Sequence, residues 1–552
     1  MQTLKKFGDW PALLLVSSLF LFSFLGSHGL METSEARYAE ISWEMARSGD
    51  WTTPRYNFIK HFHKPPLIYW ATAASFKLFG ENEFAARFPQ ALFGLGGIMA
   101  TFFLGKFLFD TLAGFLSGLA LLSTMEYFFI SRYLVTDMLL ALFITLSLLF
   151  YCKGLAKKLN WWLFFLSLSG AMLTKGPVGV LLPAMIIGLD LVIAGKWREF
   201  FRLGWGRGLL VAAAICGPWF IWLCWKNPGL LQYFVFFHTI DRFFSKVHGR
   251  PGSIFYFIPV FLIGLLPWTP LLPSLIKDYF SFNGTPEKGN NRFLAVWIIG
   301  PLVFFSLSGS KLVHYLLPIF PATALLTGKM WRDLIMEPED NRPTIRLSLS
   351  LYLAGFLLIG VFLTAFFIYT PRFSGWAQYD LSPLRNASIF LLFFCCAGMA
   401  AAWFSIKTNR AAFFFPIATL GFLLCCLVVA RSISSVEPLL SPTPVFVKKI
   451  KEHFKPGDKI IAYKCMLNSL PFYTGERIIN VSQPREILFE EDQEEAGRYV
   501  IENENSLKNF FEPGKRIFLV IKRRHLEEVR GLAGHPLSIL SETPSYMLLY
   551  GS

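Results

Sequence analysis

The stretch LMETSEARYAEISWEMARSGDW, residues 30–51, directly follows the first apolar run of the chain. Its five acidic residues are Glu32, Glu35, Glu40, Glu44 and Asp50. Tyr38, Ile41 and Met45 recur at helical spacing with polar residues between them, which predicts an amphipathic helix at a membrane surface. Thr33 or Ser34 would cap its start. Composition alone leaves open whether the carboxylates are simply solvated or belong to a functional site.

The remaining sequence places this stretch in a membrane protein. Of the 552 residues 54% are hydrophobic and 17% aromatic, and the mean hydropathy is +0.47, whereas soluble domains are about 45–50% apolar. Uncharged runs recur that are long enough to cross a hydrocarbon core of about 30 Å. The first run follows Lys5 and Lys6 as in a signal peptide, but no small-x-small cleavage site follows it. We therefore predict a retained first helix in an all-α polytopic protein.

The loops between the apolar runs predict a topology. About thirteen spans are expected, near residues 10–30, 84–109, 112–130, 134–152, 161–174, 177–195, 208–226, 255–275, 292–308, 312–332, 347–369, 386–406 and 411–430. With the amino terminus inside, most inner loops are short and basic, as the positive-inside rule requires. These loops and an outer anion site would account for much of the net charge of +15, which in a soluble protein would suggest nucleic-acid binding.

The chain changes character after the last span. We predict a transmembrane domain over residues 1–435, with an outer catalytic loop at about 31–83, and a small extracytoplasmic α/β domain over 436–552. In this tail DKIIAY, RIFLVIK and SYMLLYG are typical of short strands, and PTPVFVKKIKEHF and RRHLEEVRGL of amphipathic helices. The tail has no glycine-rich phosphate loop and no catalytic triad, which favours a supporting role. Seven of the eight cysteines lie in apolar runs and none shows metal-ligand spacing.

Several polar residues stand at the predicted outer ends of spans. SRYLVTDML puts Asp137 at the edge of an apolar helix, a costly position that is usually functional. LTKGPVGVLLP puts Lys175 in a break where freed N–H groups and an ammonium could seat a phosphate. SLSGSKLVHYLLPIFPA repeats the pattern with Lys311, His314 and Tyr315. Each basic residue could also be a solvated loop charge, but several together indicate an anion site.

Two loops hold histidines beside basic residues. In HFHKPPLIYWATAASFKLFG, Lys64 stands before a double proline that starts a second short helix, and His61 and His63 alternate. An x-His-x-His pair is weak evidence for a metal. FFHTIDRFFSKVHGRPG supplies Arg242, His248 and Arg250. A divalent ion with His63 and His248 as ligands is possible, and no other cofactor is expected.

Eight ordered blocks resemble bacterial membrane glycosyltransferases. They are SEARYAEISWEMARSGDW, HKPPLIYW, FGENEFAARFP, TDML, LTKGPVGVLLP, PWFIWL with NPG, DRF with HGRPG and FYFIPVFLIGLLPW, and SLSGSKLVHYLLPIFPA. The pattern is similar to the 4-amino-4-deoxy-L-arabinose lipid A transferases and their relatives in the protein O-mannosyltransferase-like GT-C superfamily. The resemblance covers about residues 10–335, and a C-terminal domain after thirteen spans also fits it.

This resemblance implies an inverting glycosyltransferase of the bacterial inner membrane, with its active site and C-terminal domain on the periplasmic side. It would move a sugar from an undecaprenyl phosphate donor to lipid A or lipopolysaccharide. The residues implied to surround donor phosphate and acceptor are Arg37, Tyr38, Lys64, Lys175, Arg242, Arg250, Lys311 and Tyr315, with Asp137 as their polar partner. Other polyprenyl-linked sugars (galacturonate, galactosamine or a hexose), protein O-mannosylation and, remotely, transport of such lipids are the alternatives. The chain shows no repeated halves of the kind that transporters have.

Two positions depart from the family pattern. Ser34-Glu35 stands where the family has Asp-Glu, so one carboxylate is missing, and His63 replaces the glutamate before Lys64. A phosphate acceptor is already anionic at pH 7 and needs little help from a base. The first departure therefore favours a phosphate acceptor over protein hydroxyl groups. Glu35 or Glu32 is the candidate base if the acceptor is a sugar hydroxyl.

Overall fold

The protein forms two compact units. The structure, a computed structural model, describes residues 10–155, 160–232, 252–279, 286–337, 343–369, 382–408, 410–436, 442–482, 497, 499–501, 503–511, 515–534 and 536–551. One unit, here called the helical unit, comprises Met1–Phe24, Gln90–Arg372 and Leu384–Ala430. The other, the sheet unit, comprises Leu25–Pro89, Phe373–Pro383 and Arg431–Ser552. The predicted outer loop at 31–83 thus belongs to the same unit as the C-terminal tail.

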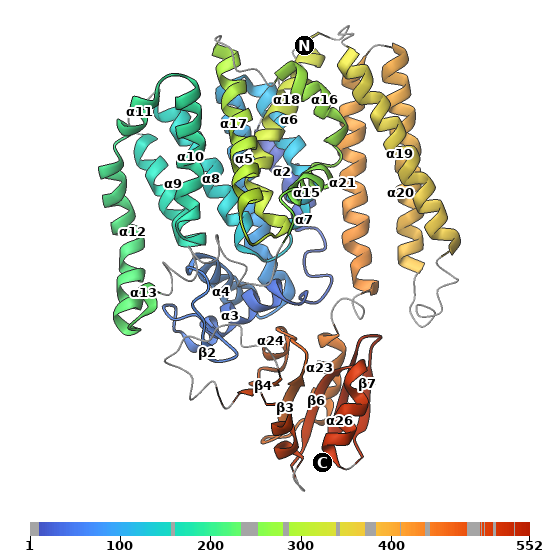
Figure 1. Ribbon diagram of the computed structural model, residues 1–552. Coiled ribbons are helices and arrows are strands. Elements are labelled where there is room, and N and C mark those ends of the chain that lie inside the picture. Colours follow the sequence, from blue (N-terminus) through green and yellow to red (C-terminus); the bar gives the residue numbers. More distant parts are fainter. Residues whose placement is uncertain are drawn as a thin grey trace. The chain divides into compact units, whose positions relative to one another are not determined.

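The helical unit is a bundle whose longest helices run side by side (Figure 1). Its principal elements are α2 (Trp10–Phe22), α5 (Glu83–Leu108, entering from the sheet unit), α6 (Thr111–Leu122), α7 (Met125–Ile130), α8 (Thr136–Gly154), α9 (Asn160–Lys175), α10 (Val178–Ile193), α11 (Trp197–Phe201), α12 (Trp205–Lys226), α15 (Phe257–Gly264), α17 (Pro286–Leu307), the 3₁₀ helix η4 (Val313–Ile319), α18 (Phe320–Met336), α19 (Pro343–Tyr369), α20 (Ser382–Thr408) and α21 (Phe414–Ser432).

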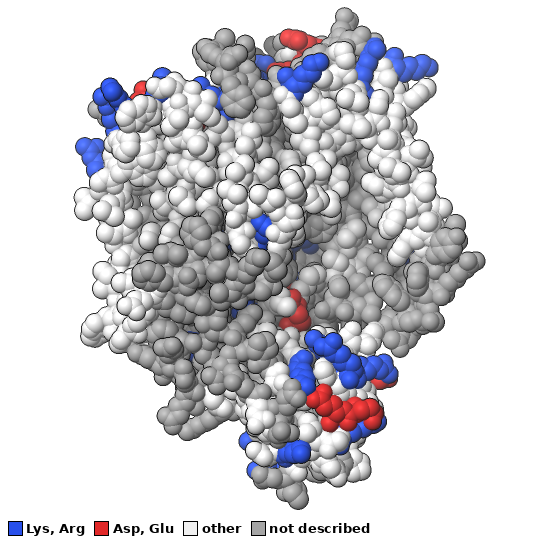
Figure 2. All heavy atoms as spheres, viewed as in Figure 1, with Lys and Arg blue, Asp and Glu red and all other residues white. Residues whose placement is uncertain are grey.

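The bundle confirms the predicted all-α membrane class. Within the described residues, seven helices are long and apolar enough to cross a membrane, or eight if Phe257–Gly264 and Thr269–Lys277, bent by 105°, form one span. The shorter apolar helices are α2, α6 and α10. Each of the predicted span ranges contains helix, but the count of thirteen spans stays a prediction. Helix α11 connects α10 to α12 at one end of the bundle (Figure 1), and Lys196, Arg198, Arg202 and Arg207 in this segment are exposed. Figure 2 shows Lys and Arg side chains gathered at that end.

Close helix contacts in the bundle depend on glycine. A Cβ at Gly114 of α6 would lie 2.5 Å from the carbonyl oxygen of Phe102 in α5. A Cβ at Gly328 of α18 would lie 2.4 Å from the backbone nitrogen of Ser117. Small residues let membrane helices approach until their backbones touch. Helix α6 is therefore packed tightly against both α5 and α18.

A buried arginine closes the end of the first helix. Arg132, which is 8% exposed, donates to the carbonyls of Phe20 (3.1 Å), Leu21 (2.7 Å) and Ser23. Carbonyls at a helix end have no partner within the helix and carry partial negative charge. The Arg132 guanidinium satisfies them where the surroundings are apolar and so fixes the end of α2.

The C-terminal tail forms a six-stranded sheet in the order β5-β4-β3-β6-β8-β7. Strands β5, β4, β3 and β6 are parallel to one another, and β8 is antiparallel to both of its neighbours, β6 and β7. The strands are β3 (Lys459–Tyr463), β4 (Ile478–Val481), β5 (Val500–Ile501), β6 (Ile517–Lys522), β7 (Ser538–Glu542) and β8 (Tyr546–Gly551). The three predicted strands are β3, β6 and β8. The two predicted helices are α23 (Thr443–His453) and α26 (Leu526–Ala533), the latter after a 3₁₀ turn.

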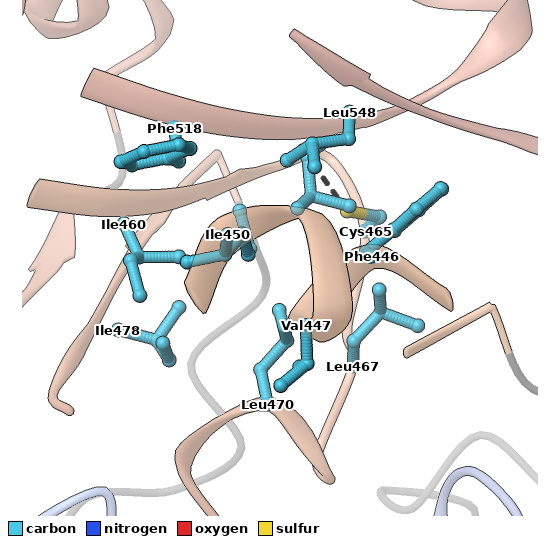
Figure 3. Close-up of a cluster of buried hydrophobic side chains, with 12 residues drawn as sticks. Phe446, Val447, Ile450, Ile460, Cys465, Leu467, Leu470, Ile478, Phe518 and Leu548 are labelled. Atoms are coloured by element: carbon cyan, nitrogen blue, oxygen red, sulfur yellow. Dashed lines mark hydrogen bonds between the residues drawn. The ribbon is translucent and has the colours of Figure 1, made fainter. Parts of the chain in front are cut away.

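Both faces of this sheet are covered. Alternate residues of β3 and β6 point to opposite faces, as a period of two requires. On one face, Ile460 and Phe518 pack with α23 and the short helix α24 (Leu470–Thr474) (Figure 3). On the other, Ile461 and Leu519 pack with Val529 of α26. The predicted small α/β domain is thus a sheet between two helical layers.

The predicted outer loop contributes two helices and a hairpin to the sheet unit. Helix α3 (Ser34–Ser48) confirms the predicted helix, with Tyr38, Ile41 and Met45 buried, but Glu40 and Glu44 are buried too, so the predicted polar, exposed face is wrong. Thr33 precedes it at φ 60° and makes no capping hydrogen bond, so the predicted cap is wrong. Helix α4 (Leu67–Phe79) begins after the double proline as expected. Between them β1 (Arg55–Tyr56) and β2 (Ile59–Lys60) form a hairpin.

Asn57 fastens this hairpin to the sheet. Asn57 and Phe58 form its two-residue turn at φ 51° and 66°, the conformation typical of tight hairpins and one that asparagine tolerates. The Asn57 amide donates to the carbonyl of Ile478 (2.8 Å) and accepts from its N–H (2.9 Å). The side chain is 2% exposed. One residue therefore sets the turn and bonds it to β4.

Replacing Asn57 with Ala should lower the free energy of unfolding by about 2–4 kcal/mol. The change leaves two buried backbone groups of Ile478 unpaired and places a Cβ without compensation in a left-handed conformation. Asn57→Gly keeps the turn and should lose only the hydrogen-bond part. Chemical unfolding in detergent would measure both. An Asn57→Ala variant as stable as the native protein would contradict this account of the turn.

Candidate active site

A buried cluster joins three elements of the helical unit. Asp137 lies in the first turn of α8 and is 2% exposed, Lys175 is the last residue of α9, and His314 and Tyr315 belong to η4. Lys175 Nζ is 2.6 Å from Asp137 Oδ1, and His314 Nε2 is 3.5 Å from Asp137 Oδ2. The same ammonium lies 4.2 Å from the centre of the Tyr315 ring. The structure thus brings together the predicted residues Asp137, Lys175 and Tyr315.

The chain folds this way because helix ends meet here. Val135 is extended, so α8 starts immediately before Asp137, whose carboxylate is favoured at a helix N-terminus. Gly176 at φ 72° ends α9 directly after Lys175, and its N–H bonds to Met172. The N–H groups of Gly179 and Val180 also bond to carbonyls within the break. These three N–H groups are therefore not available to the phosphate seat predicted for this break, and the Lys175 ammonium is its charged group.

Lys311 has different partners. Its ammonium donates to the carbonyls of Ser306 (2.7 Å), in the last turn of α17, and Ser308 (2.8 Å), directly after it. The residue is 7% exposed, and burial lowers the pKa of its ammonium. It also lies 5.7 Å from the Phe257 ring centre. Lys311 thus closes a helix end and keeps one donor beyond those two bonds.

A second polar cluster lies in the sheet unit. The Arg37 guanidinium lies 5.9 Å from the Tyr38 ring centre, and the Tyr38 and Tyr69 rings are 5.8 Å apart. The rings of His61 and His63 are 3.9 Å apart, immediately before Lys64. Burial, with the charges of Arg37 and Lys64, lowers the pKa of His61 to about 3. His61 is therefore a neutral imidazole in a positively charged environment, which suits an anionic ligand.

The described residues do not fit a metal ion. No group of three or more His, Cys, Asp or Glu side chains is placed to hold one in the described part of the chain. The two cations beside His61 would also repel a divalent ion. His63 therefore remains a predicted ligand only. The other candidate, His248, lies outside the described residues, as do Arg242 and Arg250.

Glu35, a candidate base, forms a buried ion pair. Glu35 and Arg87 are 0% and 1% exposed, and two parallel hydrogen bonds of 2.8 Å join them. Arg87 also donates to the carbonyls of Leu25, His28 and Gly29. Burial alone would raise the pKa of Glu35, but the Arg87 guanidinium holds it below its usual value. This is the geometry of a structural carboxylate.

Glu32, the other candidate base, bonds to the C-terminal tail within the sheet unit. It accepts hydrogen bonds from Thr443 Oγ1 (2.9 Å), Asn468 N (2.7 Å) and Ser469 Oγ. Burial raises the pKa of Glu32 to about 7 despite these donors. Glu40 and Glu44 are also buried. The interpretation of α3 as a helix with solvated carboxylates is therefore wrong for Glu35, Glu40 and Glu44.

One of these residues was not singled out from the sequence. Arg87 lies in an apolar helix, where a lone arginine is itself a signal that an anion faces it. It becomes recognisable through Glu35, the partner that the fold supplies. His314 was singled out with Lys311 and Tyr315, and the structure places it beside Asp137.

Comparisons with known proteins agree with this geometry. Residues 63–222 match the family model of dolichyl-phosphate-mannose-protein mannosyltransferases. The undecaprenyl phosphate-α-4-amino-4-deoxy-L-arabinose arabinosyl transferase of Aeromonas hydrophila is 30% identical over 67% of this chain and 68% of its own. That of Aeromonas salmonicida is 31% identical, over 61% of this chain and 62% of its own length.

A solved structure shares the fold along nearly the whole chain. ArnT from Cupriavidus metallidurans bound to undecaprenyl phosphate superposes with a TM-score of 0.81 at 24% identity, covering 98% of both chains. Its apo form gives a TM-score of 0.80. The fold is therefore that of the GT-C membrane glycosyltransferases. On the sequence comparison, the chain belongs to the family of undecaprenyl phosphate-α-4-amino-4-deoxy-L-arabinose arabinosyl transferases, which confirms the resemblance found in the sequence.

Proposed function

We propose that the protein transfers 4-amino-4-deoxy-L-arabinose, or a closely related sugar, from undecaprenyl phosphate to lipid A of lipopolysaccharide. The observation that carries this proposal is the buried Asp137–Lys175–His314 cluster, because a carboxylate that fixes an ammonium prepares a binding group for a phosphate. The names of the relatives supply the donor lipid and the sugar. The acceptor follows from the family resemblance.

In the proposed reaction, an acceptor oxygen attacks the anomeric carbon of the donor in line with the leaving group. A new carbon–oxygen bond forms while the bond to the phosphate oxygen breaks, and undecaprenyl phosphate leaves with the electron pair. Catalysis then consists mainly in stabilising the negative charge that gathers on the leaving phosphate. Lys175 supplies the stabilising positive charge in the helical unit, with Tyr315 packed against its ammonium. Arg37, Tyr38, Lys64 and Lys311 remain proposed substrate-binding residues.

The acceptor atom that fits this chain best is a phosphate oxygen of lipid A. A hydroxyl acceptor needs a base, and the family aspartate is replaced by Ser34. Glu35 is paired with Arg87, and Glu32 accepts hydrogen bonds from three donors. A phosphate acceptor is anionic without help. We therefore assign both carboxylates a supporting role.

We further propose that the protein lies in the bacterial inner membrane with its active site and sheet unit on the periplasmic side. The basic loops predicted to face inward support this orientation. The exposed basic residues around α11 belong to that set. Labelling of single introduced cysteines in intact cells would test it, because Lys196→Cys should be protected from an impermeant reagent while Lys459→Cys should react.

Transfer is tested by mass spectrometry of lipid A. The protein would be produced in a strain that lacks its own modifying transferases but makes the donor lipid, and lipid A would be purified. The expected result is an added mass equal to 4-amino-4-deoxy-arabinose on a phosphate, absent when Lys175→Ala is produced at the same level. An added hexose on periplasmic protein, as the name of the matching family model suggests, would favour protein mannosylation. Unmodified lipid A with verified donor would contradict the proposed acceptor.

A further inference from the structure

Two carboxyl groups hold the hairpin turn of the sheet unit. Glu40 and Glu44 are 0% and 4% exposed and lie four residues apart, on one face of α3. Glu40 Oε1 accepts from the N–H of Asn57 (2.8 Å), and Glu44 Oε1 accepts from the N–H of Phe58 (2.6 Å). Asn57 and Phe58 are the two turn residues with positive φ. The two carboxyl groups thus take up both N–H groups of the turn.

The two carboxyl groups also interact with each other. Both lie on one face of α3 and bond to neighbouring N–H groups, which places them side by side, and the buried Glu40 Oε2 accepts from no donor in the described part of the chain. Two buried carboxylates this close cannot both be ionised without a large cost. Burial and the neighbouring Glu44 raise the pKa of Glu40 well above 4.5, and burial also raises that of Glu44.

The surroundings decide which carboxyl keeps the proton. The charges nearest to Glu44 are Arg55, in the hairpin, and Arg477, before β4, and both favour its ionised form. Glu40 bonds to the N–H of Asn57, and a negative charge on Glu40 raises the pKa of the Tyr69 hydroxyl in α4. The surroundings therefore favour the ionised form of Glu44 and the protonated form of Glu40.

The hairpin carries the residues of the sheet-unit cluster. Strand β2 ends at Lys60, and the next N–H, of His61, bonds to the carbonyl of Pro54 (2.9 Å), so the pairing extends one residue further. His63 and Lys64 follow directly. A shift of the turn would therefore be passed along two short strands to His61 and Lys64.

We propose that Glu40 and Glu44 are positioning residues that share one proton, clamp the 55–60 hairpin, and so hold His61 and Lys64 in place for the substrate. The role of the clamp in substrate binding rests on the proposed function, whereas the clamp itself rests on the contacts of Glu40 and Glu44 alone. When the proton leaves, two negative charges repel each other at the base of the turn and the clamp opens. The pair therefore sets an upper pH limit for the ordered hairpin.

The sign of the pH effect follows from the direction of the shifts. Both carboxyl groups bind protons more tightly in the folded protein than in the unfolded chain. The stabilisation from the shared proton is therefore complete below the ordinary pKa of 4.5 and is lost as the pH rises through the raised value. Increasing pH should loosen the hairpin first.

The test compares Glu40→Gln with Glu40→Ala in the full-length protein in detergent. The Gln amide can donate to Glu44 permanently while its oxygen still accepts from Asn57, so it imitates the protonated acid at every pH. Ala removes both bonds. Glu452→Gln, on the exposed Glu452 of α23, is the matched control for the loss of one carboxylate. If Glu40→Ala does not fold, Glu44→Gln replaces it, because it weakens the bond to Phe58 without emptying the site.

The first readout is hydrogen exchange of the peptide covering residues 55–60, corrected for the intrinsic pH dependence. In the native protein protection should fall at least tenfold on the alkaline side; in Glu40→Gln it should persist, and in Glu40→Ala it should be low throughout. Equal pH dependence in the native protein and Glu40→Gln, or full protection in Glu40→Ala, would overturn the inference. This readout needs no activity, so it separates failure of the clamp from failure of the proposed function.

The second readout is the pH profile of lipid A modification. Glu40→Gln should retain activity within about threefold at pH 7 and extend the alkaline limb, whereas Glu40→Ala should lose at least tenfold, mainly through a raised KM. A residue with only a general structural role would lower activity without moving the limb. An alkaline limb that is unchanged in Glu40→Gln would show that the shared proton does not control positioning.

Discussion

Lys175→Ala is expected to lower the rate of sugar transfer by about 100- to 1,000-fold, the usual cost of removing one preorganised group that stabilises a leaving anion. The ammonium is fixed by Asp137 at 2.6 Å and packed on Tyr315, so it is held in place before the leaving phosphate forms. The loss should appear in kcat, because the charge it stabilises develops mainly in the transition state. Quantitative mass spectrometry of lipid A over time would measure it.

Two controls separate catalysis from folding. Lys175→Ala removes the ammonium paired with the buried Asp137 carboxylate, which costs stability, so thermal unfolding must be measured alongside activity. The double variant Lys175→Ala, Asp137→Asn relieves that cost and should recover stability but not transfer. Lys226→Ala, at the exposed end of α12, should behave as the native protein. Near-native transfer by the double variant would remove Lys175 from the proposed mechanism.

Arg87→Met is expected to destabilise the sheet unit by about 3–5 kcal/mol, the range for breaking a buried ion pair from one side. Glu35 would keep a buried charge without its partner, and three carbonyls between Leu25 and Gly29 would lose their donor. Limited proteolysis in detergent, with cleavage mapped to residues 25–89, would measure the effect. Arg87→Met combined with Glu35→Leu should recover part of the loss, because no unpaired charge then remains.

The same pair predicts behaviour in acid. The pKa of Glu35 is lower in the folded protein than in the unfolded chain, so its stabilisation is complete above the ordinary value of 4.5 and is lost as the pH falls through the lowered value. Arg87→Met should lack this acid transition. A variant that resists proteolysis as well as the native protein would show that the ion pair does not hold the segment.

Much of the architecture could be predicted because it has local signals. Runs of apolar residues located the membrane helices, the period of Tyr38, Ile41 and Met45 located α3, and the double proline located the start of α4. Short continuous apolar runs located β3, β6 and β8 in the tail. Asp137 and Lys175 stood out because charges at the ends of apolar helices are costly and therefore meaningful.

The remainder depends on contacts between residues that are distant in sequence. Glu32 and Asn57 bond to residues more than 400 positions later in the sequence. No local sequence pattern near either residue predicts these bonds. Hydropathy predicts that glutamates are exposed to solvent. The burial of Glu35, Glu40 and Glu44 follows only from hydrogen-bond partners that the fold provides. The short strands β4 and β5 are extended chiefly because β3 lies beside β4.

The composition of the sheet unit has a consequence for biosynthesis. Its first part, Leu25–Pro89, leaves the ribosome early, whereas the strands that complete it begin after Arg431. Roughly 340 residues separate the two, which at about 5–20 residues per second is roughly 20 to 70 s of translation. Throughout that interval Glu32 has none of its donors from Thr443, Asn468 and Ser469. A nascent chain that stalls or terminates late therefore leaves its earliest outer segment unfinished and open to quality-control proteases.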